Sequence, residues 1–264
     1  MIKRLSRTGI EYGDLGWNFY PGCLHKPQGI CPVPKCWAEG MSKRQRRDFH
    51  KPHLVLELLL APLSVKKPSV ILVNFMGDLF GDWVNPEQVV YPPAEVGLVS
   101  HFPEAPREKI HRGATLRELV IETVELCPQH QFLFLTKAPW NLPAWSPFSD
   151  NCFVGVSATS QAMHNGAIAC LSGIQAKVKY ISYEPLLEEV VAKYAYDLSE
   201  IQWVIIGQQT PVKKATTPKI EWVREIVEAA DKAGVKVFLK NNLLELVNYE
   251  SPETAFAFNK EGFY

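Results

Sequence analysis

The sequence predicts an α/β fold with a parallel sheet, arranged as a (β/α) barrel or partial barrel of about six to seven βα units. Three observations predict it. Short apolar runs rich in β-branched and aromatic residues recur along the chain. Each run is almost continuously apolar, as expected for strands covered on both faces. Helical patterns lie between several of the runs. An open, doubly wound parallel sheet is the alternative arrangement.

The predicted strands follow one another along the whole chain. A short strand is expected near residues 15–20. The longer apolar runs are SVILVNF (69–75), QFLFLT (131–136), CFVGVS (152–157), VKYIS (178–182), QWVIIG (202–207) and VKVFLK (235–240).

Two segments between these runs have the apolar spacing of amphipathic helices. TLRELVIETVEL (115–126) repeats its apolar residues with a period near 3.6 and should end before Pro128. KIEWVREIVEAADKAG (219–234) has the same pattern and ends on Gly234, a residue that favours helix termination. A further helix is expected from about residue 35 to residue 49.

The length of 264 residues allows one large domain or two small ones, and the composition supports a full core. We expect a single domain over residues 1–264, with a proline-rich insertion near 83–112. The formal net charge is zero, with 28 basic and 28 acidic residues, which argues against indiscriminate binding to nucleic acid or anionic membranes. The apolar runs are too short to span a membrane, and no apolar segment typical of a secretory signal follows the basic start. We therefore expect a cytoplasmic protein without membrane contact.

A segment crowded with proline and glycine, PGCLHKPQGICPVPKCWAEG (21–40), carries Cys23, Cys31 and Cys36, three of the six cysteines. In a reducing compartment, clustered thiols are more typical of metal sites than of disulfides. Three thiolates can hold a four-iron cluster that leaves one iron open. The same cysteines with His25 would supply a closed tetrahedral zinc site, and a loop without metal is the remaining alternative.

Polar residues follow each predicted strand at the point where the strand ends. Parallel strands bring their carboxyl ends to one edge of a sheet or barrel, so these residues should share a site there. Asp78 could instead cap a short helix, and the lysines could be solvated. The candidates are Cys23, Asn74, Met76, Gly77, Asp78, Lys137, Ser157, Glu184, Gln208, Gln209 and Lys240.

The segment LGWNFYPGC…CWAEGMSKR resembles the opening of an uncharacterised phage and prokaryotic family that carries three cysteines and is grouped with radical S-adenosylmethionine (SAM) enzymes. Spore photoproduct lyase is a distant relative of that family. The resemblance continues through VNFMGDLFGDWV, FLFLTKAPWNLP, FVGVSATSQ, YISYEPLLEEV and WVIIGQQTPVKKA, and so covers most of the chain in order.

The resemblance implies a TIM-barrel-like radical-SAM fold and a 4Fe–4S cluster held by Cys23, Cys31 and Cys36. SAM would bind the open iron, and its reductive cleavage would yield a 5′-deoxyadenosyl radical. The residues that would contact this cofactor are Trp37, Asn74, Met76, Gly77, Asp78, Ser157, Glu184, Gln208 and Gln209. Catalytic roles toward the substrate fall on Lys137, Glu184 and Lys240.

The chain differs from the family pattern in three places. Four residues separate Cys31 from Cys36, where the family usually has two. Trp37 stands where the family has tyrosine, so an aromatic residue is kept beside the cluster. A Gly-Gly-Glu-Ser segment of the family is replaced by Gly207-Gln208-Gln209-Thr210, which removes a carboxylate.

The basic run MSKRQRRDFHK (41–51) follows the cysteine loop and indicates either a solvated helix end or a contact with nucleic acid.

The expected function is a radical-SAM enzyme that uses an electron donor and acts on a nucleic acid or nucleotide. The alternative is a zinc-binding module that interacts with nucleic acid without radical chemistry. A metal-free barrel with only a binding role is the third reading.

Overall fold

The computed structural model describes residues 4–91, 113–192, 198–244 and 246. Its main feature is an eight-stranded sheet in the order β1-β2-β3-β6-β7-β8-β9-β10. All neighbours from β2 onward pair in parallel, and only β1 runs antiparallel, against β2. The strands are β1 (Ser6–Arg7), β2 (Leu15–Trp17), β3 (Val70–Val73), β6 (Gln131–Thr136), β7 (Cys152–Ser157), β8 (Val178–Tyr183), β9 (Trp203–Ile206) and β10 (Lys236–Leu239).

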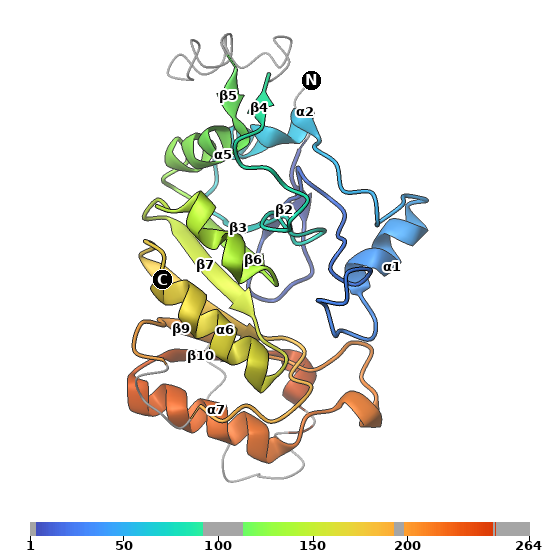
Figure 1. Cartoon of the computed structure of the whole chain (residues 1–264), viewed down its shortest axis with the longest axis vertical. Coiled ribbons are helices and arrows are strands. Elements are labelled where there is room, and N and C mark those ends of the chain that lie inside the picture. The colour runs from blue at the N-terminus through green and yellow to red at the C-terminus, as the bar shows by residue number, and fades with distance from the viewer. Residues whose placement is uncertain (1–3, 92–112, 193–197, 245, 247–264) are drawn as a thin grey trace.

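The parallel strands succeed one another in chain order, so each connection steps in the same direction along the sheet. In Figure 1, α5 (Leu116–Glu125), α6 (Gln161–Ser172) and α7 (Ile220–Ala233) follow one another from the top to the bottom of the view, while α1 (Trp37–Arg44) lies at the right. A small antiparallel pair, β4 (Val89–Val90) with β5 (Ala114–Thr115), is separate from the main sheet. The α-helices are α1 (Trp37–Arg44), α2 (Leu56–Leu59), α5 (Leu116–Glu125), α6 (Gln161–Ser172) and α7 (Ile220–Ala233).

Short 3-10 segments complete the described elements, and local sequence explains the helix ends. Thr115 and Glu118 form a reciprocal capping box at the start of α5. Gly234, at φ 69°, ends α7 in the left-handed conformation that glycine adopts without strain. The 3-10 segments are η1 (Ala61–Ser64), η2 (Pro139–Trp145), η4 (Lys214–Thr216) and η5 (Asn241–Leu243).

Alternate residues of the strands enter two separate apolar clusters. The large cluster includes Ile71, Phe132, Val154, Ile181 and Val204, together with buried residues of α5, α6 and α7. The second cluster lies on the opposite face of the sheet, because successive side chains of a strand point to opposite faces. It consists of Leu72, Leu133, Tyr180, Trp203, Ile205 and Tyr12, and partly buried residues such as Phe153 and Phe238 pack against it.

Tyr12, in the turn between β1 and β2, reaches the last strands of the sheet. Its ring makes edge-to-face contacts with Trp203 and Phe238, each at 5.8 Å between centroids. The Asn241 N–H, after β10, donates to the Glu11 carboxylate at 3.1 Å. The start of the chain therefore packs over the second cluster and connects the first strands to the last.

The predicted α/β class with a mostly parallel sheet is confirmed. The strands predicted at 131–136 and 152–157 have the predicted bounds, and the others agree to within a few residues. The helix expected at 35–49 ends earlier, at Arg44, and Arg46 has a positive φ of 56° that an α-helix does not allow. Helix α6 was not predicted, because Asn165 and Gly166 interrupt its apolar spacing.

Most of the insertion predicted near 83–112 lies outside the described residues. Within the described part, no helix is long and apolar enough to cross a membrane.

The close approach of Tyr180 to Gly155 provides a test of the second cluster. A Cβ atom on Gly155 would lie 2.2 Å from the Tyr180 ring, whereas a Cβ on Gly166 would have no neighbour within 4 Å. We expect Gly155→Ala to lower the free energy of unfolding by about 1–3 kcal/mol through overpacking. Gly166→Ala, in helix α6, should raise it by about 0.5–1 kcal/mol. Urea denaturation measures both, and equal stabilities would contradict the packing described.

Candidate functional site

The strands change from apolar to polar on the same face of the sheet as each one ends. The face that carries the second cluster continues from Leu135 to Lys137 after β6, and from Phe238 to Lys240 after β10. Ser157 pairs in register with Ser182, so β7 and β8 present hydroxyl groups side by side. The carboxyl edge of the sheet therefore gathers polar side chains above the second cluster.

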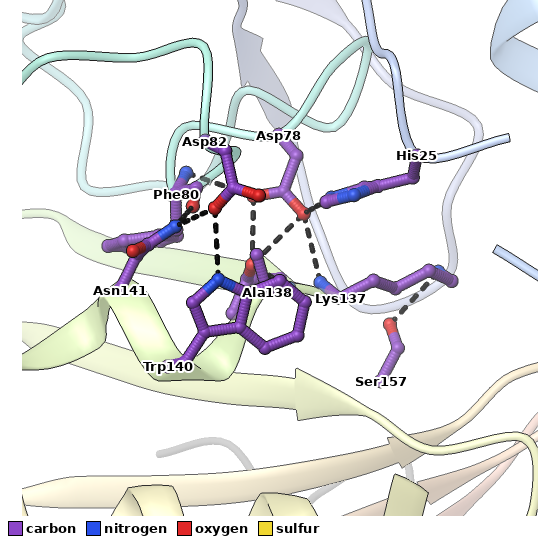
Figure 2. A network of polar contacts seen from close by, with 10 residues as sticks. His25, Asp78, Phe80, Asp82, Lys137, Ala138, Trp140, Asn141 and Ser157 are labelled. Carbon is purple, nitrogen blue, oxygen red and sulfur yellow. Dashed lines mark hydrogen bonds and ion pairs between the residues drawn. The ribbon is translucent and has the colours of Figure 1, made fainter. Parts of the chain in front are cut away.

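Asp78, just after β3, is a buried carboxylate that accepts hydrogen bonds from three segments (Figure 2). The Thr136 hydroxyl lies 2.9 Å from both of its oxygens, and the Lys137 N–H donates to Oδ2 at 2.9 Å. Its own turn contributes the Phe80 N–H at 2.9 Å. The Nε2 of His25 lies 2.7 Å from Oδ2 and, since a carboxylate accepts, carries the proton.

The hydrogen bonds of Asp78 connect three segments of the chain. Both oxygens are already hydrogen-bonded within the protein, so the carboxylate joins the cysteine loop to the ends of β3 and β6. The His25 Nδ1 is buried and has no hydrogen-bond partner in the described residues. The His25 ring also packs edge-to-face on Trp83 at 4.8 Å.

A second carboxylate of this region, Asp82, holds an exposed tryptophan. It accepts from the Trp140 indole N–H at 2.9 Å and from the Asn141 amide at 2.7 Å, as Figure 2 shows. These bonds hold the pKa of Asp82 below its usual range. Trp140 stays 49% exposed although its N–H is bonded.

Lys137 follows the end of β6 on the face of the sheet that carries the second cluster. Its Nζ donates to the Ser157 hydroxyl at 3.2 Å. No carboxylate within the described residues lies in ion-pair range of this ammonium group. Lys137 therefore brings a positive charge to the middle of the edge, and Figure 2 shows it directed toward Ser157.

Glu184 and Lys240 form an ion pair at the other end of the edge. Their charged atoms are 2.6 Å apart, and their side chains are only 17% and 18% exposed. The Tyr12 hydroxyl donates to Glu184 at 2.8 Å, and the Lys240 ammonium lies 5.7 Å from the Tyr12 ring centroid. Burial and the Glu184 charge raise the pKa of Tyr12, which keeps this hydroxyl a donor.

Gly207 lies beneath this ion pair. A Cβ there would meet Lys240 Cδ at 2.8 Å and Glu184 Oε1 at 3.1 Å, so a larger residue would displace the pair.

Asn74, Met76 and Gly77 shape the turn after β3. Asn74 has a positive φ of 55° and accepts from the Tyr20 N–H at 2.9 Å, while its own amide nitrogen is buried without a partner. The Met76 N–H donates to Asn18 at 2.9 Å. A Cβ on Gly77 would lie 2.6 Å from the Tyr20 carbonyl and 2.7 Å from that of Gly22, so only glycine fits beside the β2 loop.

Gln208 and Gln209 follow β9, and both are buried. The Gln208 amide nitrogen donates to the Asn242 carbonyl, and that of Gln209 donates to the Lys35 carbonyl at 3.1 Å. The second contact attaches the cysteine loop to the far side of the edge. The side-chain oxygens of both glutamines have no partner in the described residues.

Cys23, Cys31 and Cys36 are all half-buried free thiols. Burial raises the pKa of the Cys23 thiol to about 12, the backbone N–H of His25 opposes this, and the charges of Asp78, Cys31 and Cys36 add to it.

The ends of the cysteine loop are fixed by backbone contacts. The Cys23 N–H donates to the Phe49 carbonyl at 2.9 Å, and Gly22 pairs with Gly77 as an extension of the β2–β3 pairing. Cys36 immediately precedes α1, so Trp37, which is 51% exposed, is the first residue of that helix.

In the ranges that the structure describes, no group of three or more His, Cys, Asp or Glu side chains is arranged to hold a metal ion.

The structure thus brings Asp78, Lys137 and Ser157 together in one group, and Glu184 and Lys240 in a second group at the same edge. The described contacts do not join Cys31 or Cys36 to either group. Sequence reasoning missed Tyr12 and the partnership of His25 with Asp78. Tyr12 lies 172 residues from Glu184 in the chain, and no local pattern marks it. The sequence indicates His25 only as a possible zinc ligand. It contains no pattern that marks Trp140 beyond its position after a predicted strand.

Comparison with known proteins yields one family. The model of the family described as "Protein of unknown function (DUF5131)" matches residues 108–244, just over half of the chain. This match covers β6 to β10 and their polar ends, but not the cysteine loop. No curated protein and no solved structure matches the chain.

Both carboxylate oxygens of Asp78 accept hydrogen bonds, so removing one acceptor should lower the stability of the protein. In Asp78→Asn an amide NH₂ would replace an acceptor that faces N–H and O–H donors. We expect the free energy of unfolding to fall by about 1–3 kcal/mol, measured by urea denaturation. Asp150→Asn is the matched control, because that side chain is 87% exposed and contacts only Lys177, at 3.4 Å. Equal unfolding midpoints would show that Asp78 does not anchor the edge.

Proposed function

We propose that this chain, which belongs to the DUF5131 family, is an iron–sulfur, SAM-dependent radical enzyme that acts on a nucleic acid or nucleotide. One observation supports this most. Cys23, Cys31 and Cys36 are half-buried on the loop that follows β2, and Gly22 of this loop pairs with Gly77 at the carboxyl edge of the parallel sheet, where the polar ends of the other strands meet. In α/β folds of this kind, the carboxyl edge is where active sites lie.

The donor set fits a 4Fe–4S cluster in three respects. Three thiols leave one iron of such a cluster without a protein ligand. Burial raises the pKa of the Cys23 thiol and the backbone N–H of His25 opposes this rise, and hydrogen bonds to sulfur are among the features that set cluster properties. The thiols are half-buried, which limits their contact with water.

The strand succession supports the finer part of the fold proposal, a partial barrel. Parallel strands placed in strict chain order are the winding of a (β/α) barrel, and a doubly wound sheet reverses direction at its switch point. The contacts of Tyr12 with Trp203 and Phe238 bring the two ends of the sheet near one another across its inner face. The site would lie at the mouth of this barrel.

The polar atoms without partners are the groups that would hold SAM. Asn74 offers an amide nitrogen, and Gln208 and Gln209 offer oxygens, all three from buried side chains. Gly77 lets the turn after β3 lie against the β2 loop, which holds these groups beside the cysteine loop. The bound cluster and SAM would together supply radical chemistry, and the protein would position them and exclude water.

The charged residues have separate tasks in this proposal. Lys137, held by Ser157, would attract a negatively charged group of SAM or substrate. Glu184 and Lys240 neutralise each other, and the Tyr12 hydroxyl makes Glu184 an acceptor of fixed orientation. Asp78 acts on the loop through His25, and so positions the cysteines. An electron donor and a reducing compartment such as the cytoplasm follow from this chemistry.

The second candidate is a zinc-binding module that interacts with nucleic acid. The His25 Nδ1 favours it, because this buried atom has no partner while Nε2 is held by Asp78. Histidines that bind zinc usually give their other ring nitrogen to a carboxylate in this way. His25 with the three cysteines would complete a tetrahedral set.

Metal analysis of cysteine variants separates the two candidates. After anaerobic reconstitution, we expect a brown protein with about four iron atoms per chain. Cys23→Ser, Cys31→Ser and Cys36→Ser should each lose most of the iron, since each removes one of three ligands. Cys170→Ser, a half-buried thiol on α6, should keep it. Iron and sulfide assays with the visible absorption spectrum measure the effect.

A colourless chain after reconstitution would overturn the radical-SAM proposal. Stoichiometric zinc that is lost in His25→Ala, while iron fails to bind, would support the second candidate. Reduction of the iron-loaded protein with dithionite in the presence of SAM should release 5′-deoxyadenosine, and Cys170→Ser should behave as the parent does.

A further inference from the structure

We propose that the surface around α1 and Trp140 binds single-stranded nucleic acid beside the candidate site. This rests on the proposed function, because it names the substrate class of that site. The surface, called here the α1 surface, consists of residues 35–53. Trp140 belongs to the polar network of Asp82, Phe80 and Asp78 that includes His25 of the adjoining cysteine loop (Figure 2).

The α1 surface concentrates positive charge in a chain whose net charge is zero. Residues 35–53 contain six lysines and arginines against two acidic residues, a net charge of +4. The remainder, with 22 basic and 26 acidic residues, carries −4. Nucleic-acid phosphates would be attracted to this segment and repelled by the rest of the molecule.

Several of these charges are exposed and not neutralised. Glu39 pairs with Lys43 at 2.7 Å, and Asp48 pairs with Lys51 at 3.7 Å, so both acids of the segment are already paired. Arg46 and Arg47 are exposed and form no ion pair within the described residues. Their guanidinium groups are thus available to phosphate, which they can bind through two parallel hydrogen bonds.

Two exposed tryptophans flank the cysteine loop. Trp37 directly follows Cys36 and is 51% exposed. Trp140 is 49% exposed, and its indole N–H is fixed by Asp82, whose pKa is lowered also by the charge of His25. An indole held in place with its ring in solvent can stack on an unpaired base at little cost in conformational freedom.

The combination favours a single strand over a duplex. Bases in a duplex are stacked on one another and do not reach an aromatic ring on a surface, whereas unpaired bases do. Cys36 precedes Trp37 directly, and Gln209 holds the Lys35 carbonyl, so a strand bound here would run along the candidate site.

Binding of a labelled oligo(dT) of about 16 nucleotides, followed by fluorescence anisotropy, tests the proposal. We expect saturable binding that weakens steeply between about 50 and 200 mM salt. Arg46→Asn with Arg47→Gln should reduce the slope of log K against log salt by about 1.4, since each phosphate contact on a single strand contributes about 0.7. Asparagine tolerates the positive φ of residue 46.

Matched control variants distinguish binding by the α1 surface from a general effect of removing positive charge or an exposed aromatic side chain. Lys66→Gln with Lys67→Gln removes two exposed charges before β3, at the opposite edge, and should leave the affinity and the slope unchanged. Trp37→Ala and Trp140→Ala should each weaken binding at least about fivefold. Tyr91→Ala, at a tyrosine that is 63% exposed, should not.

Several outcomes would overturn the proposal. These are no saturable binding at low salt, equal affinity for a duplex of the same length, and equal affinity for polyglutamate. Equal effects of the surface variants and their controls would do the same. Binding is measured on the chain without added iron and again after reconstitution. Saturable binding by a chain that takes up no iron on reconstitution would overturn the radical-SAM proposal alone, whereas iron uptake without saturable binding would overturn the binding proposal alone.

Discussion

The buried carboxylate of Asp78 is the contact on which the arrangement of the candidate site depends. It accepts from the end of β6, from its own turn and from His25 in the cysteine loop. A buried carboxylate is tolerated only when its lone pairs are satisfied, so these three segments must come together for any one of them to be stable. The cysteine loop, rich in proline and without regular structure at its centre, is thereby fixed to the sheet.

The same strands that build the core also make the site, because a strand alternates its side chains with a period of two. On β8, Tyr180 packs in the second cluster, Ser182 follows it on the same face, and Glu184 follows beyond the strand end. On β10, Phe238 is followed by Lys240. The ion pair of Glu184 and Lys240 is therefore placed by strand register, with Gly207 of the strand between them leaving the necessary space.

Local patterns were sufficient to predict most strands, since buried parallel strands are continuous apolar runs, as at 131–136 and 152–157. They also predicted which residues would stand at the strand ends. They failed for α6, whose capping by Ser160 outweighs the low propensities of Asn165 and Gly166. They could not predict Tyr12 against Glu184 or His25 against Asp78, because such contacts depend on how the sheet brings distant segments together and leave no periodic signal.

The two polar groups of the edge differ in what they leave available to a ligand. Both carboxylate oxygens of Asp78 are hydrogen-bonded within the protein. The groups near it that are available to a ligand are the Lys137 ammonium and the Asn74 amide nitrogen, both hydrogen-bond donors. Beyond Glu184 the remaining groups are the oxygens of Gln208 and Gln209, both acceptors. Buried polar atoms cost about 1–3 kcal/mol each when unpaired, so a ligand that satisfies both sides would gain from them. A zwitterionic molecule, with its acidic group toward Lys137 and its donors toward the glutamines, matches this distribution. SAM has that character, which links the proposed cofactor to the polarity of the edge independently of the cysteines.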